Sequence, residues 1–129
     1  MNTTDIFRYI KERLESDSKI QEIVKGKIYP IAIMRNVKLP YIIQNAKLNS
    51  FSDTKDGEYE REITSTIAVF GENQDVPLQL ISEMERLFSG NVEEVEYLNV
   101  SEIKVNTWDF DEDDGVFGGM IELTIKIEV

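Results

Sequence analysis

The chain has 129 residues, a formal net charge of −11, and neither cysteine nor histidine. Without these two residue types there are no disulfides, thiol nucleophiles or imidazole acid–base steps, and the usual zinc sites and Ser-His-Asp triads are excluded. The acidity argues against a free nucleic-acid binder, which normally carries a basic footprint. It indicates either simple solubility or a surface that must not adhere to DNA or to an acidic neighbour. A hydrophobic content of 41% predicts one folded domain over residues 1–129.

The sequence gives no indication of a membrane segment. No run of about 18 apolar residues is present, so we expect no transmembrane helix and no membrane partner. Residues 1–15 carry charges throughout and lack the apolar centre of a signal peptide.

Two helices are expected before the first strand. Apolar residues at Phe7, Ile10 and Leu14 follow the helical repeat, and Thr4 is a plausible N-cap for this helix. A second, short helix is expected from Ser18, which has the form of a capping box with Gln21. Gly26 is well placed to end it.

Five extended segments are expected after these helices. They are Lys27–Ile33, Tyr41–Leu48, Tyr59–Phe70, Val100–Trp108 and Val116–Val129. Pro30 confines the first to a sheet edge or a loop, because proline cannot donate to a ladder. In the last, apolar and polar residues alternate, which is typical of a strand with one face on a core. The element order predicts an α+β fold, with a mostly antiparallel sheet of four to five strands and helices packed on one face.

The longest predicted unit is the strand Tyr59–Phe70 followed by a helix over Val76–Phe88. Asp75 is expected to cap this helix, whose apolar stripe is interpreted as packing. The polar start of the strand and the loop Ser50–Glu58 are interpreted as an arm that reaches a neighbouring subunit. Asp56–Gly57 in this loop is a hairpin signal.

The acidic stretch Asp109–Asp114 is predicted to be a turn between the last two strands. Its spacing does not match an EF-hand in either register, so a solvated hairpin tip is favoured over a weak cation site. Gly118 and Gly119 enter a strand rather than a helix, so they do not form a phosphate-binding loop. Trp108 and Phe110 share one strand parity and are either an aromatic lid over the core or an interface anchor.

No arrangement of residues predicts catalysis or a cofactor. Glu93, Glu94 and Glu96 lie in one polar stretch, where no difference in environment marks an acid–base pair. No spacing of serine and lysine suggests a nucleophilic dyad. We therefore expect no enzyme, no cofactor and no metal ligand.

The order of the short motifs has a known counterpart. A helical N-terminal segment leads into Gly26–Pro30, and Leu39–Ile43 places a proline before an apolar strand. The strand Ile63–Phe70 then enters the helix Val76–Phe88, and two strands split by a charged turn close the chain. This pattern resembles the tail-completion proteins of long-tailed bacteriophages, which include tail terminators, tail-to-head joining proteins and minor tail proteins.

The resemblance implies a structural role in the virion tail, with assembly in the host cytoplasm. Members of that family form rings, typically hexamers, on the last ring of the tail tube. The implied partners are further copies of the chain, the tail tube protein and the head–tail connector protein, with DNA only passing through the lumen. A strongly negative ring would keep such a lumen from binding DNA.

Residues for ring or tube contacts are expected in two polar regions, the Ser50–Glu58 loop and the acidic stretch, where Glu112 and Asp114 are included. The interaction candidates are Asp53, Lys55, Asp56, Glu58, Trp108, Asp109, Asp111 and Asp113. Three alternatives stay open: another neck, head-completion or minor tail protein; a small cytoplasmic enzyme or ligand-binding domain; and an adaptor that binds through the face Glu122–Glu128.

Overall fold

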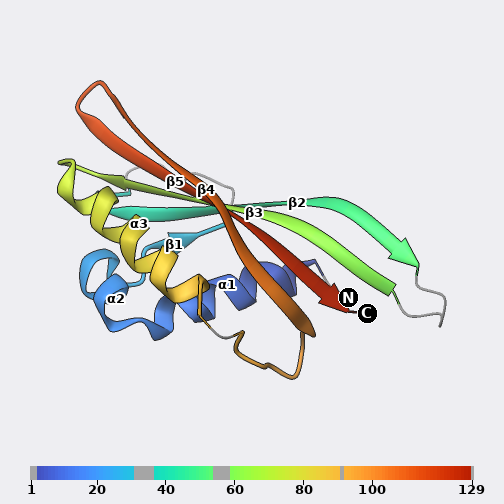
Figure 1. Cartoon of the computed structure of the whole chain (residues 1–129). Coiled ribbons are helices and arrows are strands. Elements are labelled where there is room, and N and C mark those ends of the chain that lie inside the picture. The colour runs from blue at the N-terminus through green and yellow to red at the C-terminus, as the bar shows by residue number, and fades with distance from the viewer. Residues whose placement is uncertain (1–2, 31–36, 54–58, 91, 129) are drawn as a thin grey trace.

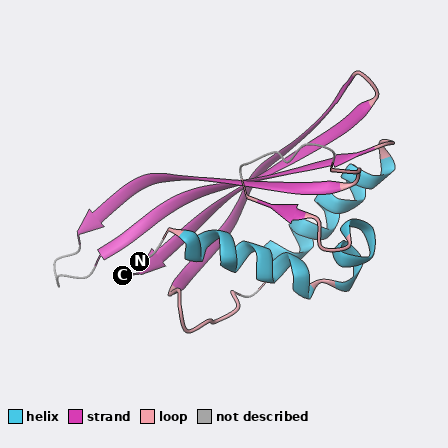
Figure 2. Ribbon diagram, turned by 180° about the vertical axis from the view of Figure 1, so that it is seen from behind, coloured by secondary structure: helices cyan, strands magenta, loops and turns pink. Residues whose placement is uncertain are grey.

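The computed structural model describes residues 3–30, 37–53, 59–90 and 92–128. Within these ranges the helices are α1 (Thr4–Ser16), α2 (Ser18–Val24) and α3 (Asp75–Phe88). The strands are β1 (Ile28–Tyr29), β2 (Tyr41–Asp53), β3 (Tyr59–Gly71), β4 (Val100–Asp113) and β5 (Val116–Glu128). They form one sheet, and the helices gather on one side of it (Figures 1 and 2). The predicted α+β class is confirmed.

The strand order across the sheet is β1-β2-β3-β5-β4. Every neighbouring pair is antiparallel except β1 and β2, which run parallel. β1 lies at an edge, as Pro30 predicts. The remainder of the predicted extended segment, residues 31–36, lies outside the described residues. β2 and β4 are each five residues longer than expected, ending at Asp53 and Asp113.

The core lies between the three helices and one face of the sheet. On β5 the residues Ile121, Leu123, Ile125 and Ile127 are buried, which confirms the alternation read from the sequence. The stripe of α3 meets them with Pro77, Leu80, Ile81, Met84 and Phe88, all buried. None of the described helices lies on the opposite sheet face, which we call the open face (Figure 2).

The predicted helix caps are each wrong by one residue. Asp17, not Ser18, caps α2, because its Oδ1 accepts hydrogen bonds from the backbone N–H of Lys19 (3.0 Å) and Ile20 (3.1 Å). Thr3, not Thr4, precedes the first turn of α1, and Gln74 rather than Asp75 precedes that of α3. In each case the helix starts at the residue that was expected to cap it. Among the three N-cap residues only Asp17 caps with its side chain, whereas those of Thr3 and Gln74 make no capping hydrogen bond.

The turn between β4 and β5 is also shorter than predicted. Asp109–Asp113 continue β4, so their assignment to a turn is wrong. Only Asp114 and Gly115 turn the chain, with φ of 50° and 80°. Positive φ at both central residues is the geometry of a type I′ hairpin, which favours Asp-Gly. The acidic side chains therefore stand on a regular strand.

Residues 92–98 cross from α3 to β4 without regular structure and are held against α1. The Tyr97 hydroxyl donates to Glu12 Oε2 at 2.6 Å, and the Arg8 guanidinium carbon lies 3.9 Å from the Tyr97 ring centroid. The Tyr9 hydroxyl donates to the backbone oxygen of Glu93 at 3.2 Å. Burial and the Glu12 carboxylate raise the pKa of Tyr97.

Replacing Tyr97 with phenylalanine is expected to lower the free energy of unfolding by about 0.5–1.5 kcal/mol near pH 8, because one hydrogen bond is lost. The pKa of Tyr97 is higher in the folded state, so its contribution is complete below about pH 10 and falls as pH rises further. The variant should therefore lose less stability than the original chain between about pH 8 and about pH 11. Urea titrations at both pH values measure this difference.

Tyr41→Phe is the control for this prediction. The Tyr41 hydroxyl makes no hydrogen bond to another described residue, and its ring lies on the open face against Phe70. An equal alkaline loss in the original chain and in Tyr97→Phe would contradict the role given to Tyr97.

Candidate interaction site

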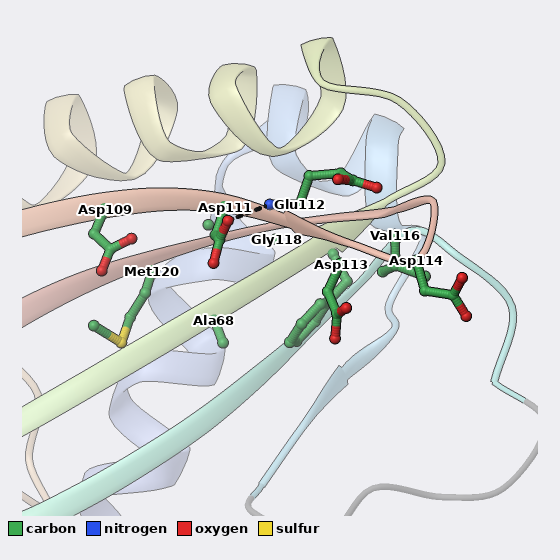
Figure 3. Close-up of a pocket in the computed structure, with 11 residues that line it drawn as sticks. Ala68, Asp109, Asp111, Glu112, Asp113, Asp114, Val116, Gly118 and Met120 are labelled. Carbon is green, nitrogen blue, oxygen red and sulfur yellow. Dashed lines mark hydrogen bonds between the residues drawn. The ribbon is translucent and has the colours of Figure 1, made fainter.

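A groove of about 630 Å³ lies where β4 and β5 approach their turn (Figure 3). Carboxylates from the β4 end and the turn line one side, and small and apolar side chains of β3 and β5 form its floor. The five carboxylates belong to Asp109, Asp111, Glu112, Asp113 and Asp114, which we call the acidic hairpin. Figure 3 shows Asp109, Asp111 and Asp113 pointing to the same side of β4.

A bulge in β4 sets this orientation. The register between β4 and β5 shifts between Val105 and Thr107. Beyond the shift, Asp109 pairs with Met120 and Asp111 pairs with Gly118, which both belong to the open face. Since side chains alternate along a strand, Asp109, Asp111 and Asp113 all stand on that face.

The groove floor is apolar and only partly covered. Ala68, Phe70 and Met120 are half-buried on the open face, and the Phe70 ring lies 5.2 Å from that of Tyr41. On the opposite side of the sheet, α3 packs against the strands that form this floor. A Cβ at Gly119 would clash with Ile81 Cδ1, so the backbone of β5 packs directly against this side chain of α3.

The negative charge of the acidic hairpin is not neutralised by the described part of the chain. Asp111 Oδ1 accepts from the backbone N–H of Glu112, and Glu112 Oε1 accepts from that of Gly115, each at 2.8 Å. These bonds order the turn but bring no positive charge. Among the described residues no lysine or arginine pairs with these carboxylates, and no group of carboxylates there has the arrangement of a metal site. The groove therefore favours a cationic partner.

The structure brings together three of the predicted interaction residues, Asp109, Asp111 and Asp113. Trp108 stands on the other face of β4, where it pairs with Ile121 and keeps 50% of its surface exposed. Phe110 shares that face and stacks on Phe117, with ring centroids 6.3 Å apart. Trp108 thus lies on the strand that carries the groove carboxylates, but outside the groove.

The other predicted interaction residues do not join this site. Asp53 ends β2, where it pairs with Tyr59. This end of the sheet lies about 40 Å from the acidic hairpin, given the strand rise over β3. Lys55, Asp56 and Glu58 lie outside the described residues, together with the hairpin signal that they contain.

Sequence reasoning missed the residues of the groove floor. The sequence places Ala68 and Phe70 on one strand parity, but only the pairing of β3 with β5 brings them next to Met120. No short-range signal encodes that pairing, because α3 and β4 separate the two strands in the chain.

No family model matches the sequence, and no curated protein is similar to it. Among solved structures, the fold is similar to a chain in the virion of a native gene transfer agent (GTA) particle. The TM-score is 0.78 at 8% identity, over 92% of this chain and 90% of that chain. The two chains share a fold. The bacteriophage SPP1 gp17 protein aligns with a TM-score of 0.49 at 19% identity, over 92% of this chain and 84% of that chain, and we base nothing on this weaker match.

None of the described helices combines the length and the apolar character needed to cross a bilayer.

Proposed function

We propose that the chain is a non-enzymatic structural protein of a phage or phage-like virion. The observation that carries this proposal is the fold shared with a chain of the gene transfer agent virion, which extends over 92% of the residues. A match of that extent spans most of the chain, so the proposal does not depend on one motif.

Within the virion, we assign the chain to the tail, as a terminator that forms a ring on the last ring of the tail tube. The motif order described above supports this assignment. The ring stops the tube from growing and presents a surface to the head connector. The acidic hairpin supports a role in contacts rather than in chemistry, because its carboxylates are solvent-exposed and line an open groove.

A tube-capping assay tests the proposal. Tail tube protein is polymerised with and without a stoichiometric amount of this chain, and tube lengths are measured by negative-stain electron microscopy. We expect tubes that stop growing, with added density at one end. Tubes of unchanged length without bound protein would contradict a terminator.

A second candidate within assembly is a neck, head-completion or minor tail protein. The shared fold supports it equally, because the matched chain is identified only as part of a virion. The same assay separates the two candidates. A neck protein would leave tube length unchanged and bind the purified connector instead.

A further inference from the structure

The sheet carries opposite charges on its two edges. The acidic hairpin occupies the β4 edge. On the β1 edge, Lys25, Lys27 and Lys38 form a group that we call the basic corner. Lys25 is the C-cap of α2, Lys27 directly precedes β1, and Lys38 comes shortly before β2. These segments are joined, since Lys27 Nζ donates to the backbone oxygen of Lys38 at 2.9 Å.

The basic corner, like the acidic hairpin, lacks a charged partner within the described chain. Within the described chain, ion pairs are formed by five other basic residues: Arg8, Arg13, Lys19, Arg86 and Lys126. The lysines of the basic corner form none with the described carboxylates, and Lys25 and Lys38 are exposed. Both edges thus offer charge that intramolecular contacts leave uncompensated.

The two charged edges lie at the same level along the strands. The backbone oxygen of Lys27 accepts from Ile42 N–H at 2.9 Å, which fixes the basic corner beside Ile42. Across the sheet, Ile42 pairs with Val69, Val69 with Gly119, and Gly119 with Phe110 in the acidic hairpin's strand. One row of paired residues therefore connects the two edges.

We propose that the acidic hairpin of one copy binds the basic corner of the next copy. The inference rests on the proposed ring and identifies its subunit interface. Because the two surfaces differ, the contact is head to tail, and its repetition builds either a ring or a filament. Because one row of paired residues joins the two surfaces, successive copies can meet without an offset along the strands, which is compatible with a closed ring.

The chemistry of the groove suits lysine side chains. Carboxylates bind the ammonium groups, while the floor of Ala68, Phe70 and Met120 takes up the methylene stems. A second copy is a better occupant than a nucleic acid, whose phosphates the carboxylates repel. Since the whole chain has a charge of −11, copies repel one another at long range, and association depends on local pairing of this kind.

Charge reversal in two variants tests the interface. The first carries Asp109→Lys, Asp111→Lys and Asp113→Lys, and the second carries Lys25→Glu, Lys27→Glu and Lys38→Glu. Each variant alone presents like charges at both edges, so we expect self-association at least about 100-fold weaker than in the original chain. An equimolar mixture should regain association, because the copies then alternate with opposite charges facing each other.

Sedimentation velocity at low ionic strength, up to about 1 mM protein, measures the association, which should weaken with added salt. The control carries Lys11→Glu, Lys47→Glu and Lys104→Glu, which cause the same change in net charge away from the basic corner. Circular dichroism verifies that all variants are folded. The control is expected to associate at least about tenfold more tightly than the basic-corner variant.

Two results overturn the inference. One is an original chain that stays monomeric over the whole concentration range. The other is association that persists in both reversed variants. If association persists while the original chain still caps tail tubes, the interface is wrong and the proposed function stands. If the original chain and the mixture associate but no tube is capped, the interface stands and the proposed function fails.

Discussion

Leu80→Ala is expected to lower the free energy of unfolding by about 2–5 kcal/mol, the largest effect of any single substitution considered for this chain. Leu80 is fully buried on α3, between the helix and the sheet. Truncation removes apolar contacts on all sides and leaves a cavity that the neighbouring strands cannot close. Chemical denaturation monitored by circular dichroism measures the loss.

Leu78→Ala is the matched control. It lies on the same helix two residues earlier and keeps 37% of its surface exposed. The helix propensities of the exchanged residues are the same at both positions, so the difference between the variants reports burial alone. A change within about 0.5 kcal/mol is expected for Leu78→Ala. Equal losses at both positions would contradict the packing of α3 on the sheet.

Gly119→Ala is expected to cost about 1–3 kcal/mol, because it overpacks the contact between β5 and α3. The added methyl group would lie 2.4 Å from Ile81 Cδ1, and Ile81 is itself buried. The end of the Ile81 side chain would have to turn away, and the close-packed core around it resists that movement. The same denaturation experiment measures the cost.

A double-mutant cycle with Ile81→Val tests the cause. Ile81→Val removes the clashing carbon and by itself costs about 0.5–1.5 kcal/mol. The double variant should be more stable than the sum of the two single losses predicts, by at least about 0.5 kcal/mol. Gly118→Ala is the control, since its methyl group would meet Phe70 at an ordinary contact distance of 3.4 Å. Strict additivity would refute the assigned contact.

The helices and strands were largely predictable from periodicity. The α3 stripe and the alternation along β5 each reflect one face turned to a core, and local spacing records that directly. Cap positions were missed because several polar residues stand next to each helix start. Asp17 and Ser18 are both good caps by type, and only the backbone conformation selects Asp17.

The candidate site was only partly predictable. The concentration of acidic residues near the end of β4 is visible in the sequence, but the direction of the side chains is not. The bulge after Val105 reverses the parity of all later residues in β4, and Asp114–Gly115 fixes the end of the strand. The apolar floor and the basic corner depend on strand order and on pairing between distant segments, which no local pattern encodes.

We have proposed that this chain closes a virion tail tube as a ring. Electron cryomicroscopy of tail tubes assembled with the chain tests it most directly. We expect a single ring of this fold at one tube end, with the β1 edge of each copy against the β4 edge of the next. Copies distributed along the tube wall, or tube ends without this chain, would contradict it.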